Sequence, residues 1–325
     1  PFLFDFIEED KKKAIYNLLN ISQEELEKFI KSYDLFSRGV IKSLDDFNQK
    51  DYDSNNFIKY SEKTTNECYN ILSDLCTIGG LKKMYIPPQF DKKVGLQENQ
   101  VLHENNIARN LNVKANSKLL EIGCGCGRIS NQISLETDSY VYGINIDKKQ
   151  IKDAIDYRNK IGNVKTIFKY GNLNETFNFD EEYFDGIYAV QPLSYCNNLK
   201  ELFKEMKRVL KPGKRIVLSD FVLLDNFNKN NKRHMKLLQG ANDVMEAVNA
   251  RHYKYFEKAI TDNDLKLIYS GPPKNKNGKL VNPEYNLLVK INSKYEFFKS
   301  LVKLLSYIPF SPKHLPIIFE RLMNG

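Results

Sequence analysis

The segment Leu119–Gly127 reads LLEIGCGCG, an apolar run that ends in an acidic residue, an isoleucine and three alternating glycines. The apolar run predicts a buried strand, and the residues after Gly127 predict a helix. Glycine suits such a turn because a Cβ would keep a ligand away from the backbone, and because some turn torsions are positive. The segment therefore predicts a ligand-binding turn between a strand and a helix. A tight turn of purely structural use is the alternative.

The spacing of the glycines and the acidic residue bears on which ligand this turn binds. A dinucleotide fingerprint has the form G-x-G-x-x-G and presents helix amides to a pyrophosphate. Here the third glycine comes one residue early, and Glu121 lies ahead of the first glycine. A carboxylate at that place repels a pyrophosphate, whereas it attracts the ammonium of a cationic, phosphate-free cofactor. The turn therefore favours S-adenosylmethionine over NAD.

The chain beyond position 111 alternates between short apolar runs and amphipathic stretches. The candidate strands are Lys118–Ile122, Tyr140–Ile144, Thr166–Tyr170, Phe184–Val190 and Arg215–Val222. A helix is predicted over Leu199–Leu210, where apolar residues recur at helical spacing and Lys211-Pro212-Gly213 ends the pattern. Strands that alternate with helices predict βαβ units. The predicted fold class is α/β, with a doubly wound and mostly parallel sheet.

The two ends of the chain have a different pattern. Residues 1–90 are polar and helical in pattern, and Ser22 with Glu25 forms a capping box ahead of an apolar helical face. After the fifth candidate strand we predict a helix over His234–Phe256, a charged loop over Lys274–Asn282 and a strand over Tyr285–Val289. The tail has an amphipathic helix around Phe297–Leu305, which we interpret as packed on the domain rather than on a membrane.

Composition limits the classes of function. The chain has 325 residues and a formal net charge of +8, but its lysines are spread along the whole length. Dispersed charge does not predict nucleic-acid binding, which needs a basic face or stripe. Two of the five cysteines lie within the glycine turn, so we expect a reducing compartment. The four histidines are isolated, so no metal site is predicted. No apolar run reaches the roughly 20 residues that span a bilayer.

Several motifs together resemble one enzyme family. They are the glycine turn, Gly143-Ile144-Asn145 with Gln150, Phe184–Ala189 and Arg208–Gly213. This set resembles class I S-adenosylmethionine-dependent methyltransferases. Within that class the chain resembles the sterol C-methyltransferase group, on His103-Glu104 with Ala108, Tyr188–Val190, and the tail from Leu301-Val302-Lys303 to Ser311-Pro312-Lys313. The resemblance implies a Rossmann-like sheet of seven strands over residues 91–290, a helical extension over 1–90 and a C-terminal helical cap over 291–325.

The strand ends and the resemblance select candidate cofactor residues. Asn145, at the end of the second strand, is expected to bind the two ribose hydroxyls, with Asp147 and Gln150 beyond it. Asn172, after the third strand, is expected to read the adenine amino group. The full set of expected cofactor residues is Glu121, Gly123, Gly125, Gly127, Asn145, Gln150, Asn172 and Val190.

The substrate half of the site departs from the sterol C-methyltransferase pattern. Where that group has an aromatic-rich stretch, this chain has Leu75–Gly80, and where the group has an acid and a histidine, it has Gln191 and Tyr195. Methylating an isolated alkene creates a carbocation that aromatic faces stabilise and a base must quench. The candidate catalytic residues are Tyr195, which offers a π face and a hydroxyl, and Asp220, which ends the fifth strand. A structural role is the alternative for each.

Two functions of different classes follow. The first is methyl transfer from S-adenosylmethionine to a lipophilic small molecule, a sterol or a prenyl-derived lipid, at a membrane periphery. The second is an accessory or scaffold subunit of a larger complex, with weak or no catalysis. An RNA or protein methyltransferase is disfavoured, because Val190-Gln191-Pro192-Leu193 is not the N/D-P-P-Y/F tetrapeptide that serves base amino groups. By resemblance the first function implies the endoplasmic reticulum, and the second allows a mitochondrial membrane complex.

Overall fold

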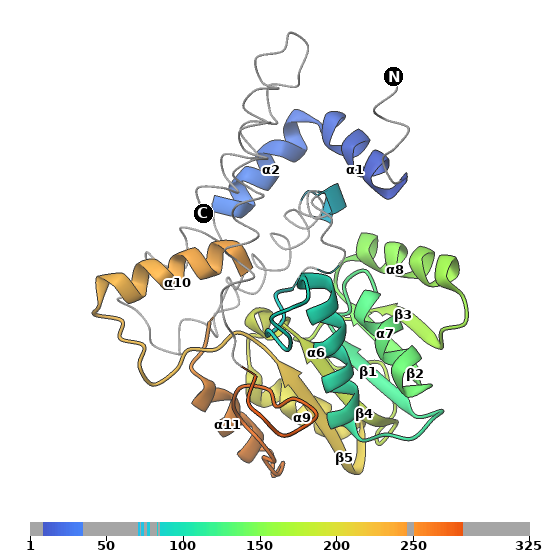
Figure 1. The fold of residues 1–325 in the computed structure, drawn as a ribbon, viewed down its shortest axis with the longest axis vertical. Coiled ribbons are helices and arrows are strands. Elements are labelled where there is room, and N and C mark those ends of the chain that lie inside the picture. The colour runs from blue at the N-terminus through green and yellow to red at the C-terminus, as the bar shows by residue number, and fades with distance from the viewer. Residues whose placement is uncertain are drawn as a thin grey trace.

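The computed structural model describes residues 9–34, 85–245 and 250–281, together with residues 71, 73, 74, 77, 78 and 83. Three predicted features lie outside the described residues: the strand Tyr285–Val289, the tail helix with the 291–325 cap, and most of Leu75–Gly80. Figure 1 shows an α/β core, with α1 (Glu9–Leu19) and α2 (Gln23–Asp34) lying away from the sheet at one end of the molecule.

A parallel sheet forms the centre of the described structure (Figure 1). Its strands are β1 (Lys118–Ile122), β2 (Tyr140–Asn145), β3 (Thr166–Tyr170), β4 (Phe184–Val190) and β5 (Leu210–Ser219). The spatial order is β3-β2-β1-β4-β5, so the chain runs outward from β1 to β3 and then returns to the other side of β1. This is the predicted doubly wound arrangement. Five strands lie within the described residues, and the count of seven stays a prediction.

Helices cover both faces of the sheet. On one face, α6 (Leu96–Leu111) and α7 (Arg128–Thr137) enclose a core that includes Leu119 of β1. On the other face, α9 (Leu199–Val209) and α11 (Tyr253–Thr261) enclose a core that includes Leu120. Neighbouring residues of a strand point to opposite faces, so the pair Leu119-Leu120 serves both cores. α8 (Lys148–Ile161) packs against β3.

The predicted start of the fifth strand is wrong. β5 begins at Leu210 rather than at Arg215. Lys211-Pro212-Gly213 follows the end of α9 as expected, but it lies within the strand, where Gly213 has a φ of +74°. The pairing with β4 shifts register across this segment. The breaker therefore marks an irregularity inside a strand rather than a loop before it.

The predicted helix His234–Phe256 is also wrong, because it is two helices, α10 (Lys232–Met245) and α11. Leu223, which follows β5, fixes the chain ahead of α11. The amide of Leu223 donates to the carbonyl of Arg251 at 2.9 Å, and the amide of Tyr253 donates to the carbonyl of Leu223 at 3.1 Å. This pairing joins residues about thirty positions apart, which helical spacing cannot reveal.

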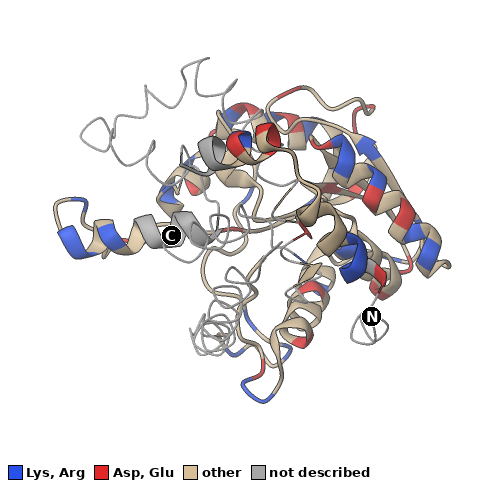
Figure 2. Cartoon of the chain, turned by 90° about the horizontal axis from the view of Figure 1, so that it is seen from above, with Lys and Arg blue, Asp and Glu red and all other residues tan. Residues whose placement is uncertain are grey.

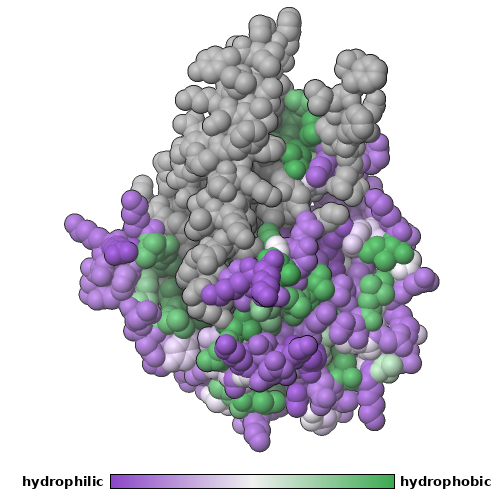
Figure 3. All heavy atoms as spheres, viewed as in Figure 1, coloured by the Kyte–Doolittle hydropathy of each residue, from purple (hydrophilic) through white to green (hydrophobic). Residues whose placement is uncertain are grey.

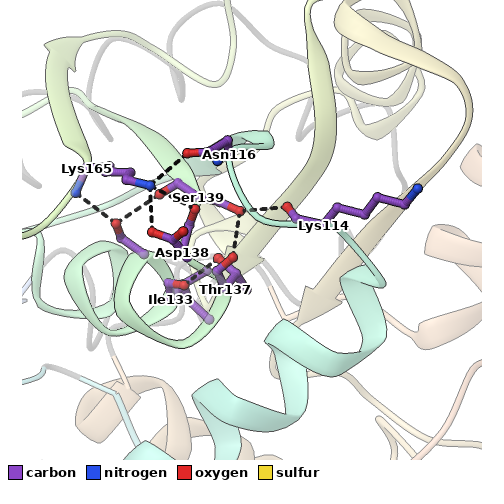
Figure 4. Close-up of polar contacts among 8 residues, drawn as sticks. Lys114, Asn116, Ile133, Thr137, Asp138, Ser139 and Lys165 are labelled. Carbon is purple, nitrogen blue, oxygen red and sulfur yellow. Dashed lines mark hydrogen bonds and ion pairs between the residues drawn. The ribbon is translucent and has the colours of Figure 1, made fainter.

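Polar contacts tie the strand starts together at the amino edge of the sheet (Figure 4). Nζ of Lys165, just before β3, lies 2.6 Å from Oδ1 of Asp138 and 2.8 Å from Oδ1 of Asn116. Asp138 and Asn116 lie in the turns ahead of β2 and β1. The contacts therefore join the starts of three neighbouring strands. In sheets of this type the opposite, carboxyl edge is where ligands bind.

The N-terminal helices lie near that carboxyl edge. The capping box is present as predicted: the amide of Ser22 donates to Oε2 of Glu25 at 3.0 Å, and the amide of Glu25 donates to Oγ of Ser22 at 3.2 Å. Burial raises the pKa of Asp153 in α8, and the Lys13 ammonium of α1 partly offsets this effect. α1 therefore lies close to the first turns of α8, which begins where β2 ends.

Candidate functional site

The glycine turn connects β1 to α7 at the carboxyl edge. The amide of Gly123 donates to the carbonyl of Ile144 at 2.9 Å. Gly123 and Gly127 have positive φ, +74° and +70°. A Cβ on Gly123 would lie 2.6 Å from Cβ of Pro192, and a Cβ on Gly127 would lie 2.5 Å from Cζ of Phe168. Packing and backbone torsion therefore both require these two glycines.

The middle glycine of the turn is different. Gly125 also has a positive φ, +50°, but the nearest atom to a Cβ built there is Oε1 of Gln150, at 3.8 Å. Among the described residues, no atom crowds that side of the backbone. Open space over a glycine at a strand-to-helix turn leaves a cradle in which a ligand can approach the main chain closely. The geometry at Gly125 therefore fits a bound cofactor.

Glu121 lies at the end of β1, two residues ahead of the turn. Its side chain is buried, with 1% of its surface exposed. Oε2 accepts hydrogen bonds from the hydroxyls of Ser130 and Tyr188, the second at 3.0 Å. Burial raises the pKa of Glu121 to about 7, and the two hydroxyls act in the opposite direction. A carboxyl group poised near neutrality in this place suits a cationic ligand.

The predicted ribose residues meet where β2 ends and α8 begins. Nδ2 of Asn145 donates to Oε1 of Gln150 at 2.8 Å, so the structure brings these two side chains together, beside Gly125. Asp147 has a different local task. Its Oδ1 caps α8 by accepting from the amides of Lys149, at 2.7 Å, and Gln150, at 3.3 Å. Asp147 therefore helps to place Gln150.

Asn172 and Val190 lie at the same edge, just after β3 and at the end of β4. Both are buried. Oδ1 of Asn172 accepts from the amide of Asn174 at 3.0 Å, and its Nδ2 donates to Oε1 of Glu175 at 3.2 Å. The parallel strands thus carry all eight expected cofactor residues to one edge of the sheet. Their individual contacts with a cofactor stay predictions.

The turn after β4 carries Gln191, which stands where the resemblance implies an acid. Gln191 has a φ of +60°, an uncommon value for a residue with a side chain. Its amide donates to the carbonyl of Ser219 at 2.8 Å, and its Nε2 donates to the carbonyl of Ile86 at 3.1 Å. Gln191 therefore joins the end of β5 to the segment that precedes α6.

The two candidate catalytic residues belong to one local assembly. Oδ2 of Asp220 accepts from the amide of Leu193, and its Oδ1 accepts from the amide of Phe221, both at 2.8 Å. Burial raises the pKa of Asp220 to about 7, against the effect of these two amides. Leu193 begins the short helix η3 (Leu193–Tyr195), which carries Tyr195. Asp220 thus fixes the start of the segment that presents Tyr195.

A buried polar cluster at α6 has no predicted role. Glu104 is buried, forms an ion pair with Lys83 and accepts a hydrogen bond from the hydroxyl of Tyr85 at 2.8 Å. Burial raises the pKa of Glu104, and Lys83 opposes this. Glu104 in turn is one of the charges that raise the pKa of Glu121. The only signal in the sequence is the pair His103-Glu104, because Lys83 and Tyr85 precede it by about twenty residues in an irregular segment.

Residues 113–269 match the family described as "Methyltransferase domain". Sterol 24-C-methyltransferase of Clavispora lusitaniae is 26% identical over 231 residues, which cover 71% of this chain and 59% of that protein. Squalene methyltransferase 1 of Botryococcus braunii is 31% identical over 173 residues, which cover 53% and 45%. The cyclopropane synthase MmaA2 from Mycobacterium tuberculosis has a TM-score of 0.60 at 15% identity, covering 74% of this chain and 81% of that one.

Residues 113–269 are thus similar to a methyltransferase domain, and the doubly wound parallel sheet is the class I methyltransferase fold. A match to a methyltransferase domain supports S-adenosylmethionine as the cofactor, which the glycine turn predicts. The similarity to sterol C-methyltransferases is confirmed at low identity, and the matched part covers less than two thirds of either relative's length. In this part of the chain, the expected cofactor residues gather at the ends of β1 to β4, and Tyr195 and Asp220 lie beyond β4 and β5.

Proposed function

We propose that this protein transfers a methyl group from S-adenosylmethionine to a lipophilic small molecule, a sterol or a prenyl-derived lipid. The observation that carries the proposal is the open space over Gly125, beside the paired side chains of Asn145 and Gln150. Packing alone gives no reason for a glycine there, whereas a cofactor lying against the backbone does. Bound S-adenosylmethionine supplies a methyl group activated on a sulfonium.

The chain's own residues divide the binding work. The buried carboxylate of Glu121 offers a negative charge for a ligand ammonium, and Ser130 and Tyr188 hold it in place. Asn145 and Gln150 offer amide groups for the ribose hydroxyls. Asn172 is proposed to read the adenine, and Val190 to supply an apolar wall. Asp220 holds η3 so that Tyr195 faces the substrate side, where alignment of acceptor and methyl group provides most of the rate.

The class of acceptor is proposed from the relatives, one of which acts on a sterol and another on squalene by name. The aromatic and apolar residues beyond β5 agree with such an acceptor, because Phe221, Leu223 and Phe227 gather with Leu238 and Ala250 in a small apolar cluster. A lipophilic acceptor reaches an enzyme most readily at a membrane periphery, and by resemblance we propose the endoplasmic reticulum. Within the described residues, no helix has the length and apolarity to cross a bilayer.

The first test is a calorimetric titration with S-adenosylmethionine, of the native chain and of Gly125→Arg. Gly162→Arg is the matched control, because Gly162 also has a positive φ, +66°, and no atom of the described residues lies within 4 Å of its Cβ position. Binding should be lost in Gly125→Arg and kept in Gly162→Arg. Radiolabelled methyl transfer to a total lipid extract then identifies the acceptor. Absence of binding to the native chain would overturn the proposal.

A second function is favoured by the way the polar groups after β4 and β5 are used. Gln191 and Asp220 both bond to the main chain, and neither is an obvious proton acceptor for a substrate. That arrangement fits an accessory or scaffold subunit that keeps the cofactor cradle but has little catalysis. Cofactor binding without methyl transfer to lipid, together with a stable large complex on native isolation, would favour this function.

A further inference from the structure

A segment after β5 projects from the body of the molecule and carries an unusual charge. We call residues 224–238 the basic arm; it contains the loop after Leu223 and the first half of α10 (Figures 1 and 2). Its exposed cations are Lys229, Lys232, Arg233 and Lys236. No acidic residue occurs from Asn226 to Asn242. Asp225 is the one acidic residue of the arm, and it lies ahead of this run.

Helix stability does not explain these cations. Lys232 and Arg233 occupy the first turn of α10, and that turn contains no acidic residue. The N-terminal end of a helix carries partial positive charge, so cations there destabilise it. Asn231 satisfies the free amides instead, since its Oδ1 accepts from the amide of Arg233 at 2.9 Å. The arm therefore holds positive charge where folding alone disfavours it.

The basic arm also exposes apolar side chains. Leu224 is 55% exposed and Leu237 is 62% exposed, whereas their neighbours Leu223 and Leu238 are buried in the cluster beneath. Figure 3 shows hydrophilic and hydrophobic residues side by side at the α10 end of the molecule. Exposed leucines beside lysines are typical of a helix that lies in a membrane interface. Clusters of four or more cations on such a helix bind anionic lipids.

Contacts within the chain hold the basic arm in place. The amide of Asn228 donates to Nδ1 of His234 at 3.0 Å, and the rings of Phe227 and His234 stack with centroids 6.2 Å apart. Phe227 and Leu238 contribute to the apolar cluster that also contains Phe221. Phe221 directly follows Asp220 at the carboxyl edge. An apolar path therefore leads from the arm to the substrate half of the site.

We propose that the basic arm docks the protein on an anionic lipid surface and presents the substrate side of the site to that surface. This inference rests on the proposed function, since a lipophilic acceptor dissolves in the membrane. Lys229, Lys232, Arg233 and Lys236 contact lipid phosphates, and Leu224 and Leu237 enter the acyl boundary. Exposed leucines distinguish this surface from a nucleic-acid site, where cations are interleaved with aromatic rings.

The test is flotation of the full chain with vesicles of phosphatidylcholine alone or with about 30% phosphatidylserine. We expect binding only to the anionic vesicles and its loss at about 0.5 M salt. Lys232→Gln/Arg233→Gln should weaken binding roughly thirtyfold, from about fivefold for each cation at an anionic surface. The control Lys152→Gln/Lys200→Gln removes the same charge from exposed positions on α8 and α9 and should bind as the native chain does. Leu237→Ser should weaken binding without changing its salt dependence.

The outcomes separate this inference from the proposed function. Flotation needs no cofactor or turnover, so it can succeed even where methyl transfer fails. Lys232→Gln/Arg233→Gln should keep full methyl transfer to an acceptor dissolved in detergent and lose it with an acceptor in anionic vesicles. If the control Lys152→Gln/Lys200→Gln loses flotation to the same extent, the effect depends only on the net charge of the protein, and the inference is overturned. Binding to RNA or to a protein partner with no binding to anionic vesicles would also overturn it.

Discussion

The turn after β1 and the turn after β4 lie at the same edge of one sheet, but their residues with positive φ have different surroundings. In the first turn, Gly125 has a positive φ and open space above it. In the second, Gln191 has a similar φ, but its side chain reaches the main chain at Ile86. At the first turn the positive φ costs glycine little, and the open space above it is explained by a ligand that approaches the backbone. Strain at the second is compensated within the protein.

The same contrast holds for two carboxyl groups, of which Glu121 is buried and Asp220 is partly buried. Burial raises the pKa of both Glu121 and Asp220 to about 7. Glu121 is held by the side chains of Ser130 and Tyr188, and Asp220 by main-chain amides. A carboxylate bonded through both oxygens to main-chain amides positions a loop, whereas both hydroxyl bonds to Glu121 end on Oε2. We therefore interpret Glu121 of the cofactor half as a ligand-binding group and Asp220 of the substrate half as the group that holds η3 in place.

The largest effect should come from the glycines of the first turn. Gly127→Val places a side chain against Phe168 and Ala154 at a positive φ, and we expect a loss of about 3 kcal/mol or more of folding stability. Gly125→Ala should cost only about 1 kcal/mol, from its φ alone. Its affinity for S-adenosylmethionine should nevertheless fall at least about tenfold. Denaturant unfolding and calorimetry measure the two quantities.

This pair of variants can break the comparison. If Gly125→Ala binds the cofactor as tightly as the native chain, the open space over Gly125 is not the cradle. If Gly127→Val is as stable as Gly125→Ala, the crowding at Gly127 relaxes freely and the packing argument fails.

The next effect should come from Asp220→Asn. The Nδ2 group of the new asparagine is a hydrogen-bond donor, and it faces a main-chain N–H that is also a donor. The hydrogen bond from the amide of either Leu193 or Phe221 is therefore lost. We expect a loss of about 2 kcal/mol of stability, the typical cost of a buried group left without its partner. Asp156→Asn, at an exposed position of α8, is the control and should leave the melting temperature unchanged. Cofactor affinity should be the same in all three proteins, because Asp220 belongs to the other half.

The parts of the fold that sequence predicts well are those with local causes. β1, β3 and β4 begin and end at the predicted residues, because each is an apolar run flanked by polar residues or glycine. The capping box at Ser22 and Glu25 is likewise local. The errors arise where partners are distant: Leu223 pairs with Arg251 and breaks the predicted helix, and the pairing of β5 with β4 draws the breaker into a strand.

The candidate site likewise has a part that local sequence predicts and a part that depends on distant contacts. Spacing around the strand ends is enough to predict that Asn145 and Gln150 act together, since they are five residues apart and flank a single helix start. The bond from Gln191 to Ile86 spans 105 residues, and no pattern in the sequence announces it. The ion pair of Lys83 with Glu104 is hidden for the same reason. Sequence therefore predicts the cofactor half better than the substrate half.

A smaller effect should appear in the pH dependence of cofactor binding. Glu121 has a pKa of about 7, raised by burial, so it is ionised above pH 7 and protonated below it. An ammonium is attracted only to the ionised form. Affinity should therefore rise about tenfold from pH 6 to pH 8, the change in the ionised fraction of one group with this pKa. Calorimetry on Glu121→Gln should give weaker binding that does not change over this range. A native chain whose affinity is flat from pH 6 to pH 8 would contradict this role of Glu121.

The smallest effect should come from Tyr195→Phe, which tests whether the substrate half still has chemistry. The ring stays and the hydroxyl is lost, and cofactor affinity should be unchanged because Tyr195 belongs to the substrate half. Methyl transfer should fall about fivefold, the worth of one neutral hydrogen bond of about 1 kcal/mol. Tyr195→Ala removes the π face as well and should fall further, because a developing cation loses the ring that stabilises it. If Phe and Ala lower the rate equally, the hydroxyl carries the role and the ring does not. If neither variant lowers the rate of methyl transfer, Tyr195 takes no part in the chemistry, and Asp220 holds η3 for a structural purpose alone. That result would support the scaffold function.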